Sequence, residues 1–141
     1  KDLLVQSQTG TGKTAAFAIP LIERLVEKKP NQVLIMAPTR ELVIQLSQEI
    51  YSFCGRKKIK VALLYGGQSF SSQEKRLRQG AEIVIGTPGR TVDHINQHSY
   101  KTDKIEYLIL DEVDEMMKAG FADDLEEILK YSSRGNVLSF L

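Results

Sequence analysis

The sequence predicts a single α/β domain in which a mainly parallel β-sheet is flanked by helices on both faces. Short apolar runs alternate with segments of helical periodicity, a spacing typical of repeated strand and helix units. The chain has 141 residues, 42% of them hydrophobic, which is enough to bury the core of one domain over residues 1–141. The runs that predict strands are Leu3–Val5, Val33–Ala37, Val61–Tyr65, Ile83–Ile85, Ile105–Leu110 and Val137–Phe140.

The first strand leads into a glycine-containing loop that is followed by a helical segment. This strand, loop and helix context is typical of a phosphate-binding loop, in which glycines let backbone N–H groups approach phosphate oxygens. Ser7 replaces the first glycine of the generic pattern, and a chance glycine turn is the alternative. Pro20 predicts a kink or restart of the helix after Ile19. The loop residues expected to bind a nucleoside triphosphate are Ser7, Gln8, Thr9, Gly10, Thr11, Gly12, Lys13 and Thr14.

Lys13 and Thr14 have separate expected roles in this loop. The Lys13 ammonium can reach the β- and γ-phosphates. The Thr14 hydroxyl can serve as a ligand of Mg²⁺, a cation that prefers oxygen ligands and bridges phosphates. The loop therefore predicts a Mg²⁺–nucleotide complex.

Two segments in the middle of the chain begin with a threonine at a helix N-cap. Thr39 and Thr87 precede helical patterns, and Pro88 holds the first helical position. Helix N-termini bind phosphate through unpaired backbone N–H groups, and Arg40 and Arg90 add guanidinium groups beside them. The alternative for each segment alone is a capped helix with a solvated arginine.

Gly66 and Gly67 follow the third predicted strand. Two glycines permit close approach of another backbone, which suits a nucleic-acid strand held by its phosphates without recognition of base sequence.

Two stripes of apolar residues at helical spacing should pack on the sheet. They are Leu42, Leu46, Ile50 and Phe53, and Leu125, Ile128 and Leu129.

Asp111 and Glu112 follow the apolar run Ile105–Leu110. Ligands bind at the carboxyl edge of such sheets, so Asp111 is placed to hold Mg²⁺ and Glu112 to orient or deprotonate an attacking water. A solvated acidic loop that also includes Asp114 and Glu115 is the structural alternative. A protease recognition site is a third interpretation, but it requires an exposed, extended segment.

In this order the motifs resemble the first RecA-like domain of a DEAD-box RNA helicase. The resemblance rests on the phosphate loop, Pro38 to Gln45, Gly66-Gly67, Thr87 to Arg90 and Asp111 to Asp114. It implies ATP and Mg²⁺ as cofactors, with Lys13, Asp111 and Glu112 as catalytic residues and Thr14 and Asp111 at the metal. The residues that it places against RNA are Pro38, Thr39, Arg40, Gly67, Thr87, Pro88, Gly89 and Arg90.

The resemblance also implies parts that this sequence lacks or alters. Val113 stands where the family usually has alanine. Its larger side chain must fit a tight site, and overpacking of such a site can lower stability by about 1–3 kcal/mol. Asp114 would couple hydrolysis to strand separation through a Ser-Ala-Thr motif after Val137–Phe140, which is either truncated or altered. We expect an upstream glutamine-containing adenine-recognition segment and a second RecA-like domain in cis to be absent from these 141 residues.

Composition excludes some other classes of protein. The 19 basic and 18 acidic residues give a net charge of +1, so any RNA surface must be a local patch. Arg56-Lys57-Lys58 and Lys60 should form a solvated turn. The single Cys54 excludes an internal disulfide and should pack in the core. His94 and His98 are four residues apart and could share a helix face, but they should lie on the surface, without a metal. With no membrane-length apolar run or signal peptide, we expect a cytoplasmic or nuclear protein.

The favoured function is the ATP-binding domain of an RNA-dependent ATPase that unwinds short duplexes or remodels RNA–protein complexes. Its expected partners are single-stranded or duplex RNA, a second domain in cis and regulatory proteins, and the domain alone should be weakly active. One alternative is a nucleotide-dependent RNA clamp with little turnover. Another is a different phosphate-loop enzyme, such as a DNA translocase or a small-molecule kinase.

Overall fold

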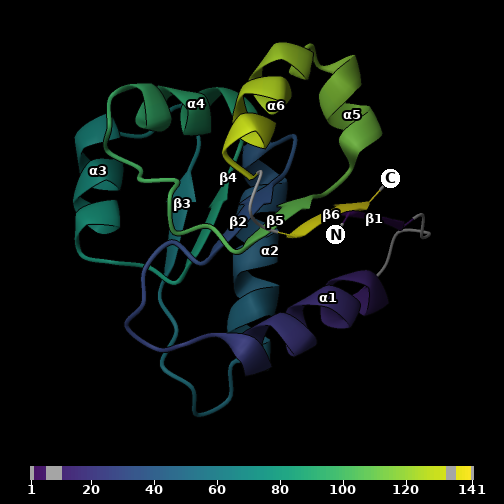
Figure 1. The fold of residues 1–141 in the computed structure, drawn as a ribbon, viewed down its shortest axis with the longest axis vertical. Helices are drawn as coiled ribbons and strands as arrows, with labels where there is room; N and C mark the ends of the chain where they lie inside the picture. The colour runs from purple at the N-terminus through teal and green to yellow at the C-terminus, as the bar shows by residue number, and fades with distance from the viewer. Residues whose placement is uncertain (1, 6–10, 133–135, 141) are drawn as a thin grey trace.

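The computed structural model describes residues 2–5, 11–132 and 136–140, and contains a six-stranded sheet (Figure 1). The strand order is β1-β6-β5-β2-β4-β3, and every pairing is parallel. This confirms the predicted α/β class. The strands are β1 (Asp2–Val5), β2 (Val33–Met36), β3 (Val61–Leu64), β4 (Ile83–Gly86), β5 (Tyr107–Leu110) and β6 (Asn136–Phe140).

Helices cover both faces of the sheet. They are α1 (Thr11–Arg24), α2 (Arg40–Phe53), α3 (Phe70–Arg78), α4 (Pro88–Asn96), α5 (Val113–Lys118) and α6 (Ala122–Leu129), followed by the 3₁₀ turn η1 (Lys130–Ser132). Apolar side chains of α1 and α2 form one core with one face of the strands. Those of α3 to α6 form a second core with the opposite face. The central strands β2 and β4 are buried throughout, which explains their continuous apolar sequences.

The helix α1 continues through Pro20, so of the kink or restart predicted after Ile19 the restart does not occur. Pro20 and Ala16, four residues earlier, are both exposed. The carbonyl group that loses its intrahelical donor therefore faces water, which can bond to it. Phe17 and Leu21 are buried in the first core on either side of this position and hold both halves of the helix in place.

Three other predictions need correction. Leu125 and Ile128 are buried, but Leu129 is 40% exposed because the core-facing side of α6 is already occupied by those two residues. His94 is fully buried, and is therefore not a surface residue. His98 is exposed and lies beyond the end of α4 with φ of 61°, so the two histidines do not share a helix face.

The basic segment after α2 differs in part from a solvated turn. Arg56, Lys58 and Lys60 are exposed, as expected. The Lys57 ammonium, however, donates to the carbonyl oxygens of Ile22 (2.7 Å) and Glu23 (3.2 Å) near the end of α1. It satisfies two terminal carbonyl groups of that helix and complements its negative end. Cys54 packs against the first core, as predicted.

No helix within the described ranges is long and apolar enough to span a bilayer.

Candidate functional site

The motifs singled out in the sequence meet at the carboxyl edge of the parallel sheet. Because all strands run in one direction, the segments that leave their carboxyl ends emerge together. Residues 6–10 follow β1 in the sequence, Thr39 lies shortly after β2, and Gly66 lies shortly after β3. Thr87 and Asp111 directly follow β4 and β5. This edge is therefore the candidate functional site.

Only part of the phosphate loop lies among the described residues. Ser7, Gln8, Thr9 and Gly10 are outside them. Thr11 begins α1, so Gly12, Lys13 and Thr14 occupy its first turn. A Cβ atom placed on Gly12 would meet no other atom within 4 Å, so the backbone faces open space at this point. The N-terminus of such a helix presents unpaired backbone N–H groups that can bind an anionic ligand.

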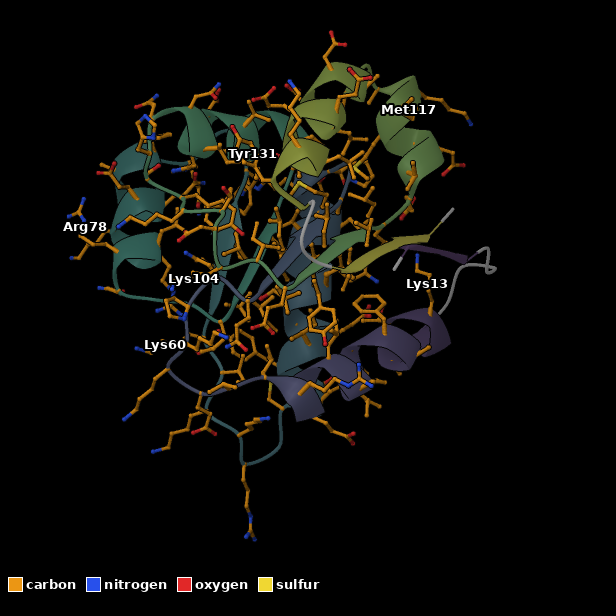
Figure 2. All side chains as sticks on the ribbon, viewed as in Figure 1. Lys13, Lys60, Arg78, Lys104, Met117 and Tyr131 are labelled. Carbon is orange, nitrogen blue, oxygen red and sulfur yellow. The ribbon has the colours of Figure 1, made fainter. Side chains whose placement is uncertain are left out.

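Lys13 forms an ion pair with Asp111 across the end of β6. Its Nζ atom lies 2.6 Å from Asp111 Oδ1, and the side chains of Lys13 and Asp111 are 9% and 1% exposed. Figure 2 shows the Lys13 side chain directed from α1 towards the sheet. The two halves of the predicted nucleotide site are thus in direct contact, although 98 positions separate them in the sequence.

The second carboxylate oxygen of Asp111 has a different environment from the first. Asp111 Oδ2 is buried and has no hydrogen-bond partner among the residues that the structure describes. The backbone N–H of Asp111 donates to the carbonyl oxygen of Met36 at 2.9 Å, which ties the residue to the end of β2. A buried carboxylate oxygen without a partner is costly unless a ligand or water completes it.

Glu112 has a left-handed backbone, with φ of 53° and ψ of 55°, at the N-cap of α5. A residue with a Cβ atom pays about 1–2 kcal/mol for this conformation, and such residues cluster at functional sites. Burial, together with the adjacent Asp111 carboxylate, raises the pKa of Glu112. The sequence predicted the residue but carried no signal for its backbone conformation.

Val113 and Asp114 occupy the first turn of α5. Val113 is half-buried and packs against the second core, so its additional methyl groups contact apolar neighbours. Asp114 is exposed, and its charge complements the positive end of the helix.

The structure brings the Thr39-Arg40 segment beside the Gly66-Gly67 turn. Thr39 caps α2 as predicted, because its Oγ1 atom accepts from the Leu42 N–H at 3.2 Å. The Arg40 guanidinium lies over the Tyr65 ring, 5.2 Å from its centroid. Gly67 has φ of 83°, which favours glycine, and a Cβ there would lie 3.9 Å from Arg40 Nη1.

The Thr87 segment approaches the same turn from β4. Thr87 is the N-cap of α4 and Pro88 holds its first turn, but the Thr87 side chain makes no capping hydrogen bond. Arg90 Nη1 donates to the Gln68 carbonyl oxygen at 3.2 Å. Pro38 and Gly89 are half-buried on the same two segments. Two of the residues predicted to face RNA, Arg40 and Arg90, therefore both reach the turn that contains Gly66 and Gly67.

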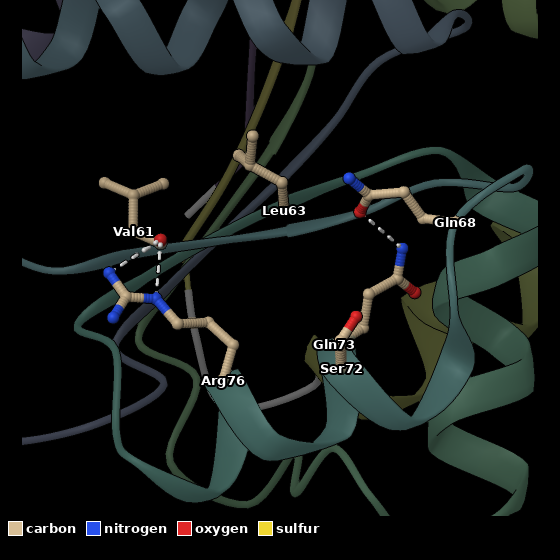
Figure 3. Close-up of a pocket in the computed structure, with 6 residues that line it drawn as sticks. All are labelled: Val61, Leu63, Gln68, Ser72, Gln73 and Arg76. Atoms are coloured by element: carbon tan, nitrogen blue, oxygen red, sulfur yellow. Dashed lines mark hydrogen bonds between the residues drawn. The ribbon is translucent and has the colours of Figure 1, made fainter.

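Sequence reasoning missed one polar residue behind this turn, Gln73, and misplaced another, His94, on the surface. Gln73 and His94 are 3% and 0% exposed. Gln73 lies four residues before the buried Leu77 on α3, so helical spacing could have marked it as inward-facing. The side chains of Gln73 and Gln68 also border a pocket of about 200 Å³ at the edge of β3, where Arg76 donates to the Val61 carbonyl oxygen (Figure 3).

A family model described as DEAD/DEAH box helicase matches residues 1–140. The chain belongs to this family. A protein named ATP-dependent RNA helicase CshA, from Listeria monocytogenes, is 53% identical over 131 residues, which cover 92% of this chain and 25% of that protein. A Bacillus subtilis protein named DEAD-box ATP-dependent RNA helicase CshA is 48% identical, with 92% of this chain and 26% of the relative covered.

Solved structures of the family have the same fold. The crystal structure of a DEAD box protein from the hyperthermophile Methanococcus jannaschii matches with a TM-score of 0.94 and 46% identity. The match covers 99% of this chain and 38% of that one. The RecA-like fold predicted for the domain is therefore confirmed. The chain spans about a quarter of the length of the curated relatives that it matches.

Proposed function

We propose that this chain is the ATP-binding domain of an RNA-dependent ATPase that unwinds short RNA duplexes or remodels RNA–protein complexes. The observation that carries the proposal is the contact between Lys13 and Asp111 at the sheet edge where Arg40, Gly67 and Arg90 also gather. One edge then offers both a site for triphosphate and a cationic surface for a nucleic-acid backbone. Membership of the DEAD/DEAH box helicase family supports both assignments.

In this proposal residues 7–14 bind the phosphates of ATP, and Lys13 exchanges its contact with Asp111 for the β- and γ-phosphates. The donor set also fits Mg²⁺, because Asp111 Oδ2 is buried without a partner among the described residues and Thr14 is buried in the adjacent helix turn. Thr14 and Asp111 would hold the ion, which would neutralise phosphate charge when bound.

Glu112 is proposed to orient the attacking water or accept its proton. Glu112 directly follows Asp111 in the sequence. The left-handed backbone of Glu112 sets the direction of its side chain relative to α5. A raised pKa makes a carboxylate a better proton acceptor, provided that it remains ionised at the working pH. Asp114 is proposed to couple hydrolysis to strand separation.

The proposed RNA surface consists of Pro38, Thr39, Arg40, Gly67, Thr87, Pro88, Gly89 and Arg90. Arg40 and Arg90 supply charge, and the N-terminus of α2 supplies backbone N–H groups. Contacts of this kind recognise the phosphate backbone and are independent of base sequence.

The complete protein is proposed to contain an adenine-recognition segment upstream and a second RecA-like domain, which closes over ATP and RNA and supplies arginines to the transition state. Regulatory proteins are further proposed partners. Alone, residues 1–141 should hydrolyse ATP weakly. A cytoplasmic location is proposed because the curated relatives with the same domain are bacterial.

The proposal is tested by RNA-stimulated ATPase activity of the complete protein and its Glu112→Gln variant. Stimulation by RNA but not by DNA, with loss of turnover and retained ATP binding in the variant, is expected. Equal stimulation by DNA would favour a translocase. ATP-dependent RNA binding without single-turnover hydrolysis would favour the clamp, the alternative that Val113 motivates.

A further inference from the structure

Gln73, on α3, has an amide group whose orientation is determined by its surroundings. Its Nε2 atom lies 2.8 Å from the carbonyl oxygen of Tyr65, which can only accept a hydrogen bond. The nitrogen end must therefore face Tyr65, and the Oε1 atom must face the opposite way. Because Tyr65 directly precedes Gly66 and Gly67, this bond also holds the base of the glycine turn.

Two donors meet the Oε1 atom of Gln73. Arg90 Nη1 lies 3.3 Å from it and His94 Nε2 lies 2.9 Å from it. Since Oε1 accepts, His94 Nε2 carries a hydrogen and His94 Nδ1 is free to accept from the Ser99 hydroxyl, 2.7 Å away. Burial and the nearby Arg90 charge lower the pKa of His94 to about 4, which keeps the imidazole neutral near pH 7.

The ring of Phe70 contacts both His94 and Arg90, the two donors to Gln73. Its ring stacks on the His94 imidazole at a centroid distance of 3.9 Å and an interplanar angle of 7°. The Arg90 guanidinium lies 5.8 Å from the centroid of the same ring. Phe70 is the first residue of α3, so the helix that carries Gln73 also packs against the group that Gln73 binds.

The Nη1 end of Arg90 is thus fully used, by the Gln68 carbonyl and by Gln73 Oε1. A guanidinium has five N–H donors, and Nη1 supplies two of them. The edge formed by Nε and Nη2 has no hydrogen-bond partner within the described part of the chain. This edge is a fork that matches two oxygens of a phosphate.

We propose that Gln73 is a positioning residue for RNA binding, which holds the Nη1 end of Arg90 so that its Nε and Nη2 edge faces the RNA backbone. His94 supports the same acceptor from behind. The inference rests on the proposed RNA-binding role of Arg90 and extends it to two buried residues, Gln73 and His94. Gln73 also connects Arg90 to the glycine turn, so both RNA segments depend on one amide group.

The test is a double-mutant cycle on the affinity of the complete protein for a fluorescein-labelled oligouridylate, in the presence of a non-hydrolysable ATP analogue. Gln73→Met keeps the side-chain length and removes both hydrogen-bonding groups. It should weaken RNA binding about fivefold in the parent and leave the affinity nearly unchanged in an Arg90→Ala background. Gln79→Met, the same change at the exposed C-cap residue that follows α3, is the matched control.

ATP-analogue affinity separates positioning from general damage, because Gln73→Met should leave it unchanged. An equal loss of RNA affinity with and without Arg90, or no loss, overturns the inference. If Arg90→Ala itself leaves RNA affinity unchanged, the proposed RNA surface fails as well, so the two failures are distinguishable.

If Gln73→Met does not fold, His94 supplies the same test. His94→Gln retains an amide N–H donor directed at Gln73, whereas His94→Leu does not. RNA affinity close to that of the parent in His94→Gln, with weakened binding in His94→Leu and equal ATP-analogue affinity in both, supports the inference. Equal RNA affinity in the two variants overturns it.

Discussion

Lys13 Nζ lies 2.6 Å from Asp111 Oδ1, and both side chains are nearly inaccessible to solvent. β1, which precedes Lys13, and β5, which precedes Asp111, lie on either side of β6. Lys13 therefore neutralises a carboxylate whose burial would otherwise be costly. In the proposed function this pair must separate when ATP enters.

Removing the lysine should destabilise the free protein. Lys13→Met leaves the Asp111 carboxylate buried without its cation, and breaking a buried pair in this way costs about 3 kcal/mol. Lys13→Met/Asp111→Asn should recover most of that loss, because no buried charge remains. Urea denaturation of the three variants and the parent measures both quantities. Additive losses in the double variant would show that the pair does not stabilise the fold.

Gly86 should not tolerate a side chain. A Cβ at this position would overlap Thr91 Oγ1 and lie 2.9 Å from the Leu64 carbonyl oxygen. Gly86→Ala should lower the free energy of unfolding by about 2–3 kcal/mol. Gly66→Ala is the control, because a Cβ there meets nothing within 4 Å. Comparable unfolding midpoints for the two variants would contradict the packing at the end of β4.

The stability of the protein should depend on pH through His94. Its pKa is about 4 in the folded protein and near 6.5 in an unfolded chain. Between these values the unfolded state binds more protons, so the free energy of unfolding falls as the pH drops from 6.5 to 4, by up to about 3 kcal/mol.

Chemical denaturation of the parent and of His94→Gln over this pH range measures the contribution of His94. Carboxylates such as Asp124, whose pKa is raised by burial, contribute to both proteins and cancel in the comparison. The parent should lose more stability than the variant. Parallel curves would mean that the buried imidazole becomes charged without a penalty.

Arg40 should contribute to RNA binding through its position as well as its charge. Its guanidinium stacks on the Tyr65 ring beside Gly67, an arrangement that lysine does not reproduce. Arg40→Ala should weaken RNA binding about tenfold, and Arg40→Lys should recover only part of the loss. Both should leave ATP affinity without RNA unchanged. Fluorescence anisotropy at two salt concentrations measures the RNA affinity of each variant. Full recovery of affinity by lysine would show that only net charge matters.

The sequence predicted the strands and most helices because buried parallel strands produce continuous apolar runs, and because Thr39 and Pro88 mark helix starts by local chemistry. It predicted that Lys13 and Asp111 belong to one site through the motif order. It did not predict their direct contact, which depends on the strand order that places β1 and β5 on either side of β6.

The residues that were missed or misplaced depend on tertiary structure. Pro20 continues a helix because both halves of α1 are held by the core, and Lys57 caps that helix from a segment distant in sequence. His94 can be buried because Ser99 and Gln73 form hydrogen bonds with its two ring nitrogens, and Phe70 stacks on its ring. No local pattern encodes such partners.

The nucleotide site is best tested by calorimetric titration of Mg²⁺–ADP and Mg²⁺–ATP into the complete protein, beside its Lys13→Ala variant. The parent should bind both nucleotides, and the variant should lose affinity by about tenfold or more, because in the proposed function Lys13 exchanges Asp111 for the phosphates. Equal affinities in parent and variant, or no binding by the parent, would contradict a nucleotide site built on Lys13 and Asp111.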